Sequence, residues 1–200
     1  MNYVTDAFKC FGLDEAAVFL HSQNVAVVRY ALNKNKYLLA PEVQKLRQLL
    51  RDFMAKDTRN CLLLELALRT GARAQELLNV QKFDLNPYDQ SVLIRGLKGS
   101  NDREIPVAAD YFQQLHRFSE GQPGNKVFPI SYDRLYQIWE VYRPIPKKFH
   151  SLRHTFAIEL YQRTRDLRLV QVALGHRNIQ NTMIYADYLY SVQELKRLIL

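Results

Sequence analysis

Residues 150–185 read HSLRHTFAIELYQRTRDLRLVQVALGHRNIQNTMIY. His150 and Arg153 stand three residues apart, so a helix that begins here places both side chains on one face. Gly175 suits the left-handed position that closes a helix, which leaves His176 just outside that helix. The stretch therefore predicts basic side chains at the start of one helix and a further imidazole just beyond a helix end.

The same stretch carries an apolar pattern at helical spacing. Leu152, Phe156 and Leu160 recur at four-residue steps and predict a stripe that faces the core, on the side away from the basic groups. Tyr185 lies in the next helical pattern, whose apolar side is formed by Ile179, Met183 and Ile184. No pair of carboxylates stands near these groups. Guanidinium, imidazole and phenol groups in this combination suit chemistry on a phosphodiester.

Composition and charge indicate a soluble globular chain with a polyanionic partner. The 200 residues permit one sizeable core or two small domains, and 48% of them are hydrophobic and 24% charged. The net charge of +8 and the pI near 9.5 favour binding to a polyanion. Between Arg143 and Arg177 eight basic residues stand against two acidic ones, which places most of the net charge there. A solvated basic face is the alternative interpretation of these charges.

Cysteine usage and the absence of targeting patterns indicate the compartment. Cys10 and Cys61 are too few for a disulfide framework, and neither lies in a CxxC pattern, so a reducing compartment fits. No apolar run is long enough to span a bilayer, and the first residues lack the layout of a signal peptide. We therefore expect a cytoplasmic protein, which would act in the host cytoplasm or nucleoid if a phage or plasmid encodes it.

The remaining patterns predict an α+β fold that is mainly α. Helical patterns cover residues 41–53, 58–70, 73–79, 108–118, 132–141 and 191–200. Alternating patterns with turn residues between them predict short strands at residues 82–85, 91–97 and 103–107. Residues 1–37 are the hardest to interpret and end in a polar turn.

Four segments together resemble the tyrosine recombinase (phage integrase) family. The motif HSLRH at residues 150–154 is followed by LGH at residues 174–176 and, nine residues further on, by Tyr185. TGARAQELL at residues 70–78 resembles the family's first arginine box. LKGSNDREIPV at residues 97–107 resembles the hairpin that carries its catalytic lysine. The segments stand in the family's order, and the resemblance covers about residues 41–187.

The resemblance implies a domain organisation. Residues 38–200 are expected to form the tyrosine recombinase catalytic domain, with a small three-stranded antiparallel sheet at one edge and a carboxy-terminal tail helix. In the family a separate helical domain normally precedes the catalytic one and clamps the other side of the DNA. Residues 1–37 are too few for that domain, so we expect a short amino-terminal extension.

The resemblance also assigns roles on a phosphodiester. Arg73 and Arg153 match two family arginines, whose forks bind nonbridging oxygens and stabilise the charge of the transition state. Glu76 follows Arg73 by three residues and is expected to hold that guanidinium through a helical ion pair. Lys98 matches the lysine that protonates the 5′-oxygen as it leaves.

Tyr185 is the expected nucleophile, and it would form a 3′-phosphotyrosyl link with DNA. A phenol with a pKa of about 10 needs local positive charge to ionise near pH 7. His150 is the expected acceptor of its proton, and His176 is expected to hydrogen-bond the scissile phosphate. Tyr188 and Tyr190 are close rivals, but only Tyr185 keeps the family's distance from the LGH histidine.

Three further basic residues are candidates for DNA contacts: Lys147, Lys148 and Arg177. His150 and His154 stand four residues apart, a spacing that can also hold zinc. No carboxylate or cysteine completes such a site, so we expect His154 to pack or to bond the backbone. We expect no metal and no cofactor.

The sequence leaves functional alternatives open. The preferred interpretation is a site-specific recombinase that cleaves and rejoins double-stranded DNA without a metal ion. A DNA-binding accessory or directionality protein with the same fold is one alternative, although loss of the chemistry should have removed at least one of the six matched catalytic residues. Strand nicking and rejoining like that of type IB topoisomerases is another. The sequence does not distinguish integration, excision, inversion and resolution.

Strand exchange between two DNA sites predicts a homo-oligomer, expected to be a tetramer, which accessory DNA-bending proteins would assist. The tail at residues 191–200 places four apolar side chains on one helical face: Val192, Leu195, Leu198 and Ile199. A helix of this length is marginal alone in water, so the face must dock. It is expected to dock on a neighbouring subunit, as in the resembling family, or alternatively on its own domain.

Overall fold

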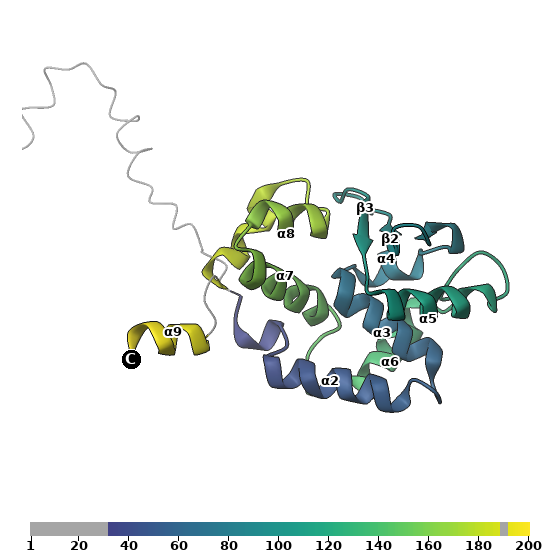
Figure 1. Cartoon of the computed structure of the whole chain (residues 1–200), viewed down its shortest axis with the longest axis horizontal. Helices are drawn as coiled ribbons and strands as arrows, with labels where there is room; N and C mark the ends of the chain where they lie inside the picture. Colours follow the sequence, from purple (N-terminus) through teal and green to yellow (C-terminus); the bar gives the residue numbers. More distant parts are fainter. Residues whose placement is uncertain (1–31, 189–191) are drawn as a thin grey trace, which may run out of the picture. The chain divides into compact units, whose positions relative to one another are not determined.

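The computed structural model describes residues 32–188 and 192–200 of the chain (Figure 1). Its α-helices are α2 Ala40–Phe53, α3 Thr58–Thr70, α4 Ala74–Leu78, α5 Ala109–Glu120, α6 Tyr132–Tyr142, α7 Ser151–Thr164, α8 Leu167–Leu174 and α9 Val192–Ile199. Short 3-10 helices are η1 Lys34–Lys36, η2 Lys82–Asp84, η3 Ile179–Asn181 and η4 Met183–Tyr188. The strands are β1 Leu85–Asn86, β2 Ser91–Ile94 and β3 Arg103–Pro106. Most of the extension predicted over residues 1–37 lies outside the described residues.

The helix ends follow local sequence signals. Pro41 lies in the first turn of α2, where its missing N–H has no intrahelical acceptor. Gly71 closes α3 at φ +59° and Gly175 closes α8 at φ +69°, the left-handed conformation that glycine adopts at least cost. The predicted ends of these two helices are therefore confirmed.

One break in the helical pattern is not predicted from the sequence. Arg165 has a left-handed φ of +60° and ends α7. The Asp166 carboxylate then accepts hydrogen bonds from the backbone N–H groups of Arg168 and Leu169 at 2.8 and 3.0 Å, which starts α8. The chain therefore turns between two helices at a point where the apolar pattern continues.

The sheet is antiparallel, with the strand order β1-β2-β3, which confirms the predicted three-stranded sheet. Val92 pairs with both Leu85 and Ile105, so three buried apolar side chains form one row. The strand predicted at residues 82–85 is largely wrong. The Asp84 carboxylate accepts a hydrogen bond from the Gln81 N–H at 2.9 Å and stabilises the tight turn η2 instead.

Helix α3 is at the centre of the main core. Every residue from Cys61 to Leu68 is buried, and α2, α5 and α7 contact this helix (Figure 1). The inward face of α2 carries Val43, Leu46 and Leu50. Phe53 is exposed at the end of α2.

A second apolar cluster lies among α7, α8 and η4. Its buried members are Leu32, Ala157, Ile158, Leu160, Tyr161, Val170, Leu174 and Tyr185. Helix α7 joins the two clusters, because Leu152 belongs to the main core and Leu160 to the second cluster. The predicted apolar stripe of α7 is confirmed, but the side expected to face away from the core is also covered, since Arg153 is buried.

The tail helix is confirmed as α9, and what it docks on stays a prediction. Leu195, Leu198 and Ile199 are exposed. The helices in the described part of the chain are all too short or too polar to cross a membrane.

Candidate active site

Arg73 is positioned by the turn between α3 and α4. Its backbone N–H donates to Glu76 Oε2 at 2.8 Å, so the carboxylate caps the first turn of α4. Its guanidinium Nη1 donates to Glu76 Oε1 at 3.0 Å. The predicted helical ion pair is therefore present, and one third of the Arg73 side chain remains exposed (34%).

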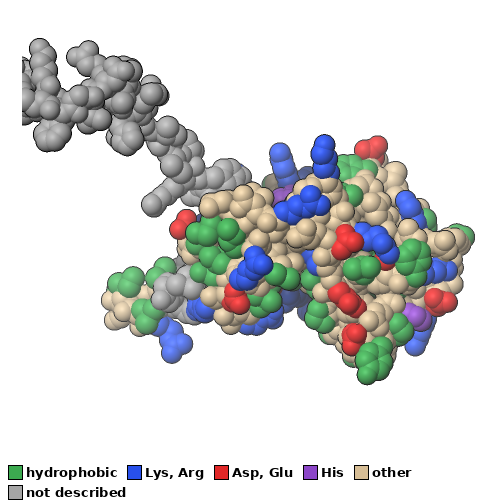
Figure 2. Space-filling model, turned by 90° about the horizontal axis from the view of Figure 1, so that it is seen from above, with side chains coloured by type: hydrophobic (Ala, Val, Ile, Leu, Met, Phe, Trp, Pro, Cys, Tyr) green, Lys and Arg blue, Asp and Glu red, His purple; other side chains and the backbone are tan. Residues whose placement is uncertain are grey.

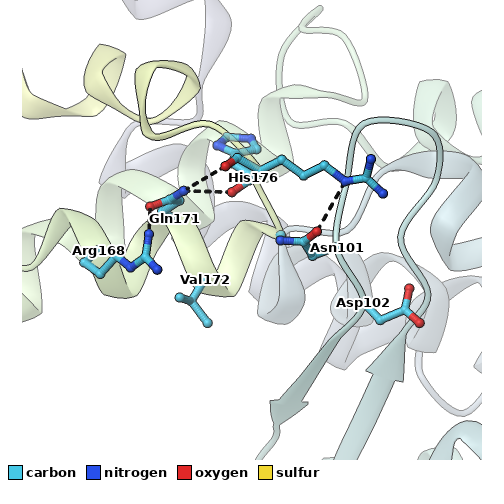
Figure 3. Close-up of a pocket in the computed structure, with 8 residues that line it drawn as sticks. Asn101, Asp102, Arg168, Gln171, Val172 and His176 are labelled. Carbon is cyan, nitrogen blue, oxygen red and sulfur yellow. Dashed lines mark hydrogen bonds between the residues drawn. The ribbon is translucent and has the colours of Figure 1, made fainter.

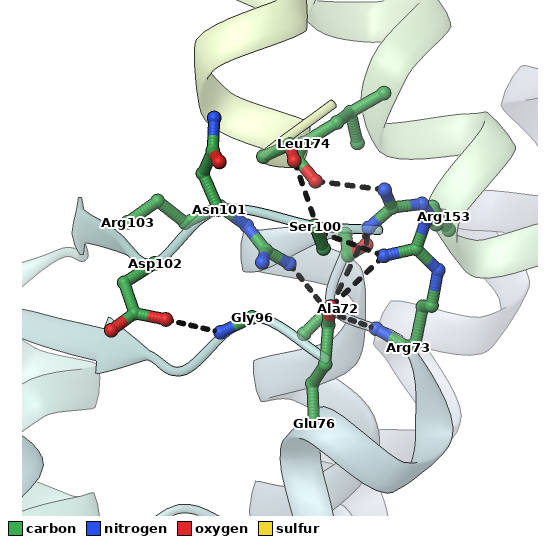
Figure 4. A network of polar contacts seen from close by, with 12 residues as sticks. Ala72, Arg73, Glu76, Gly96, Ser100, Asn101, Asp102, Arg103, Arg153 and Leu174 are labelled. Atoms are coloured by element: carbon green, nitrogen blue, oxygen red, sulfur yellow. Dashed lines mark hydrogen bonds and ion pairs between the residues drawn. The ribbon is translucent and has the colours of Figure 1, made fainter. Parts of the chain in front are cut away.

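Glu76 holds more than the one arginine that the sequence predicts. Its carboxylate is completely buried and accepts from Arg103 Nη2 at 2.7 Å, with Arg153 Nη1 3.8 Å away (Figure 4). Burial opposes ionisation of this carboxyl, but the hydrogen bond and charge of Arg103 outweigh it and lower the pKa of Glu76. Arg103, on β3, is a residue that sequence reasoning missed, because a lone arginine in a strand pattern gives no signal of burial.

Arg153 joins the ends of two helices. Nη1 donates to the Gly71 carbonyl at 2.7 Å and Nη2 to the Leu174 carbonyl at 2.8 Å. These carbonyls lie at the carboxy-terminal ends of α3 and α8, where the helix dipole favours a cation. Only 2% of Arg153 is exposed, and burial, with the charges of Arg73 and Arg103, lowers its pKa to about 9.

The two imidazoles at the start of α7 have different surroundings. His150 precedes α7 and is exposed, whereas His154 is partly buried and its ring centroid lies 4.8 Å from that of His150. Although His150 reaches solvent, the protein atoms around its ring partly desolvate it, and with the charges of Arg153 and Arg73 they lower its pKa. Desolvation and the neighbouring His150 and Arg153 lower the pKa of His154 to about 3. Both rings are therefore neutral near pH 7, although each is a weaker base than a free imidazole.

His176 follows the left-handed Gly175 and is held by a local contact. Its Nδ1 lies 2.9 Å from the buried Thr182 hydroxyl oxygen. Burial, with the charges of Arg153 and Arg73, lowers the pKa of His176 to about 4. The ring is thus oriented by one nitrogen and is neutral near pH 7, which leaves the other nitrogen for a ligand.

Tyr185 lies in η4 and is almost fully buried, with 1% exposed. Its hydroxyl is 3.0 Å from His154 Nδ1. His154 packs against the rings of His150 and Tyr185, as expected, but its hydrogen bond is to the phenol and not to the backbone. Met183 was predicted on the apolar side of this segment but is exposed, because Tyr185 itself takes the inward position.

The rival tyrosines are placed differently. Tyr188 packs edge-on against Tyr37 with the ring centroids 5.3 Å apart, and burial raises its pKa. Tyr190 lies outside the described residues.

Lys98 is exposed on the loop between β2 and β3, two residues before the buried Ser100, which contacts Arg73.

The predicted contact of Lys147 with DNA is corrected by the structure. Its ammonium donates to Glu42 Oε2 and to the Tyr37 carbonyl, both at 2.7 Å, and only 7% of the residue is exposed. It therefore anchors residues 37–42 and offers no free charge at the surface. Lys148 and Arg177 are exposed, as a contact with DNA requires.

A small hollow of about 160 Å³ lies beside the LGH turn (Figure 3). Arg168 and Gln171 project into it from α8, and Asn101 faces them from the hairpin loop (Figure 3). Arg177 Nε donates to Asn101 Oδ1 at 3.3 Å, so the loop and the turn are joined across the hollow. Arg168 thus adds a cation that the sequence alone did not single out.

Basic side chains are not confined to this hollow. On the face shown in Figure 2, Lys and Arg side chains lie at the edge and over the centre, with Asp and Glu side chains among them. In residues 32–188 and 192–200 no three or more His, Cys, Asp or Glu side chains are grouped so that they could hold a metal ion.

Comparison with known proteins gives consistent matches. The family model described as "Phage integrase family" matches residues 36–191. Tyrosine recombinase XerA of Pyrococcus horikoshii is 28% identical over 92% of this chain and 68% of its own length. Tyrosine recombinase XerC of Staphylococcus aureus is 33% identical over 84% of this chain and 62% of its own length.

Solved structures give the same fold. The XerH site-specific recombinase bound to its difH substrate in a pre-cleavage complex is 26% identical, with a TM-score of 0.65 over 82% of this chain and 53% of that chain. The catalytic domain of bacteriophage HP1 integrase is 23% identical, with a TM-score of 0.59 over 82% of this chain and 94% of that chain. This chain thus spans about half to two thirds of the length of these recombinases and 94% of the isolated catalytic domain.

Proposed function

The chain belongs to the phage integrase family, and on that premise we propose that it is a site-specific tyrosine recombinase that cleaves and rejoins double-stranded DNA. One observation carries the proposal. Arg73 and Arg153 share the buried carboxylate of Glu76, Arg153 donates to the carbonyl of Leu174 in the LGH motif, and His154 contacts the hydroxyl of Tyr185. Motifs that are distant in the sequence therefore meet at one place.

The proposed cleavage step is a direct displacement at phosphorus. The Tyr185 oxygen forms a bond to the phosphorus, and the bond from phosphorus to the 5′-oxygen breaks. Lys98 gives a proton to the leaving 5′-oxygen, and a neutral imidazole of the His150–His154 pair takes the phenolic proton. Rejoining reverses the step with a 5′-hydroxyl as the attacking group, so the energy of the phosphodiester bond is conserved.

The burial of Tyr185 implies a rearrangement before cleavage. A phosphodiester cannot reach a phenol that is 1% exposed, so η4 must shift relative to α7 before attack. The contact of 3.0 Å with His154 holds the phenol until then. We propose that binding of DNA and of further subunits supplies the free energy for this shift.

A nicked suicide substrate tests the proposal. Cleavage releases a short fragment beyond the nick, so religation is prevented and the protein stays attached to DNA. The expected product resists SDS. Absence of any adduct on DNA that the protein binds would favour the alternative of a DNA-binding protein without chemistry, whereas adducts on a single duplex without exchange between duplexes would favour topoisomerase-like nicking.

Cleavage should proceed without a metal ion. The proposed step draws its positive charge from Arg73 and Arg153 and its proton donor from Lys98, so a divalent cation has no assigned role. The yield of SDS-resistant adduct in EDTA should lie within about twofold of the yield in Mg²⁺. Loss of the adduct in EDTA and its recovery on adding Mg²⁺ or Zn²⁺ would contradict the mechanism.

Truncation after Tyr190 should separate DNA binding from assembly. We propose a tetramer on two DNA sites in which α9 docks on a neighbouring subunit, because a helix with exposed Leu195, Leu198 and Ile199 needs an apolar partner surface. The truncated protein should stay folded and bind a half-site, yet form no complex of two duplexes in gel-shift or sedimentation assays. Unfolding of the truncated protein, or normal recombination by it, would show that the tail does not act between subunits.

A further inference from the structure

The buried hydroxyl of Ser100 is one of the groups that fasten the loop between β2 and β3 to the LGH turn. Ser100 is 3% exposed, and its Oγ accepts a hydrogen bond from Arg73 Nη1 at 2.9 Å and donates one to the Gly175 carbonyl at 3.0 Å (Figure 4). A hydroxyl has one donor and two acceptor sites, so one small group can make both bonds. Alanine can make neither of them.

The backbone around Ser100 is built for this close approach. The Asn101 N–H donates to the Gly175 carbonyl at 2.8 Å. A Cβ at Gly175 would lie 2.6 Å from the Asn101 carbonyl oxygen, and a Cβ at Gly96 would lie 2.4 Å from that of Ser100. Glycine at position 175 therefore lets the loop contact the turn, and glycine at position 96 lets the loop close on itself.

The base of the same loop is closed separately. The Asp102 carboxylate accepts a hydrogen bond from the Gly96 N–H at 2.7 Å (Figure 4). The Ser100 N–H donates to the Leu97 carbonyl at 2.8 Å and closes the turn that contains Lys98. Lys98 is thus an exposed side chain on a turn whose end is fixed by Ser100, while its own side chain remains free to reach a ligand.

From this geometry we propose that Ser100 is a positioning residue, which holds the turn of Lys98 against Arg73 and the LGH motif so that the lysine reaches the leaving 5′-oxygen. The proposal rests on the proposed function, because it assumes that Lys98 is the proton donor. Arg73 also donates to Glu76, through a contact that does not involve Ser100. Loss of the hydroxyl should therefore affect proton donation more than phosphate binding.

Chemistry at the leaving group separates proton donation from other effects. A 5′-alcohol has a pKa near that of water, about 15.7, and needs a proton as it leaves. A thiol has a pKa of about 8.5 and leaves as the thiolate. A substrate with sulfur in place of the bridging 5′-oxygen therefore no longer needs Lys98, or any residue that acts through Lys98.

The experiment measures single-turnover cleavage of two nicked substrates, one with the 5′-oxygen and one with 5′-sulfur, by the full chain. Ser100→Ala should cleave the oxygen substrate about 10- to 100-fold more slowly than wild type, since misplacement of a catalytic group by about 1 Å costs up to about 100-fold. It should cleave the sulfur substrate within about threefold of wild type. Lys98→Ala should show the same pattern with a larger defect.

Ser119→Ala is the matched control, because Ser119 is also buried and its hydroxyl donates to a backbone carbonyl, that of His116 at 2.7 Å, in α5. It should cleave both substrates like wild type.

An equal defect of Ser100→Ala on both substrates, or no defect on either, would overturn the positioning role. If Lys98→Ala is not rescued by sulfur, the assigned proton donor is wrong and Ser100 loses its role with it. Failure of the wild type to form an adduct on either substrate would instead refute the proposed function, and the Ser100 proposal with it.

Discussion

Replacing Tyr185 by phenylalanine should abolish covalent attachment to DNA while DNA affinity stays near that of the wild type. The hydroxyl oxygen is the only atom removed, and it is the atom that would form the bond to phosphorus. Its loss leaves His154 Nδ1 without the contact at 3.0 Å, which should lower the free energy of unfolding by only about 1 kcal/mol. The variant should therefore stay folded.

The measurement is the yield of SDS-resistant adduct on a nicked suicide substrate, with binding followed separately by gel shift. Tyr188→Phe is the matched control, because Tyr188 lies in the same 3-10 segment and packs against Tyr37. It should form the adduct like wild type. An adduct that persists in the Tyr185 variant, or that disappears in the Tyr188 variant, would show that the nucleophile is assigned to the wrong residue.

Local signals in the sequence were enough to predict most of the fold. Helix starts and ends were correct where a single residue determines the backbone, as at Pro41, Gly71 and Gly175. The break at Arg165 was missed because nothing in an arginine predicts a left-handed conformation, and the apolar pattern runs through it. The strand at residues 82–85 was wrong because the Asp84 side chain competes for the backbone, which alternation alone does not reveal.

The candidate site was predicted by motif and not by geometry, and this explains what was missed. Arg103 and Ser100 are polar residues in a strand and a loop whose burial depends on α8, a segment some 70 residues away in the chain. Lys147 was predicted to be free at the surface because its partner was missed in the same way. It belongs to a basic stretch, but Glu42, far away in sequence, neutralises it. Long-range partners of this kind are absent from any local pattern.

Removing the carboxylate of Glu76 should produce the largest loss of stability among the variants considered. Glu76 is completely buried and accepts from Arg73 and Arg103, with Arg153 within 3.8 Å. Glu76→Ala leaves two buried guanidinium groups, those of Arg103 and Arg153, without their counterion. Removing one partner of a buried ion pair costs about 3–5 kcal/mol. The free energy of unfolding should fall by about that amount.

Unfolding in urea, followed by the fluorescence of the buried Trp139, measures this loss, since urea does not screen charges. Glu159→Ala is the control, because Glu159 pairs with Arg47 at 3.5 Å on the surface, where both side chains are more than 40% exposed. Such a pair contributes about 0–1 kcal/mol. Equal urea midpoints for the two variants would contradict the central role of Glu76.

The pH dependence of the loss identifies its origin. The folded state lowers the pKa of Glu76, so its ionisation stabilises the fold above the pKa of an unfolded glutamate, about 4.3, and this stabilisation is lost as the pH falls through the folded pKa. Glu76→Gln keeps the shape of the side chain and lacks the charge. The difference in unfolding free energy between wild type and Glu76→Gln should therefore be constant near neutral pH and shrink below about pH 4. A difference that stays constant down to pH 3 would mean that packing, and not the charge shared by the three arginines, makes Glu76 necessary.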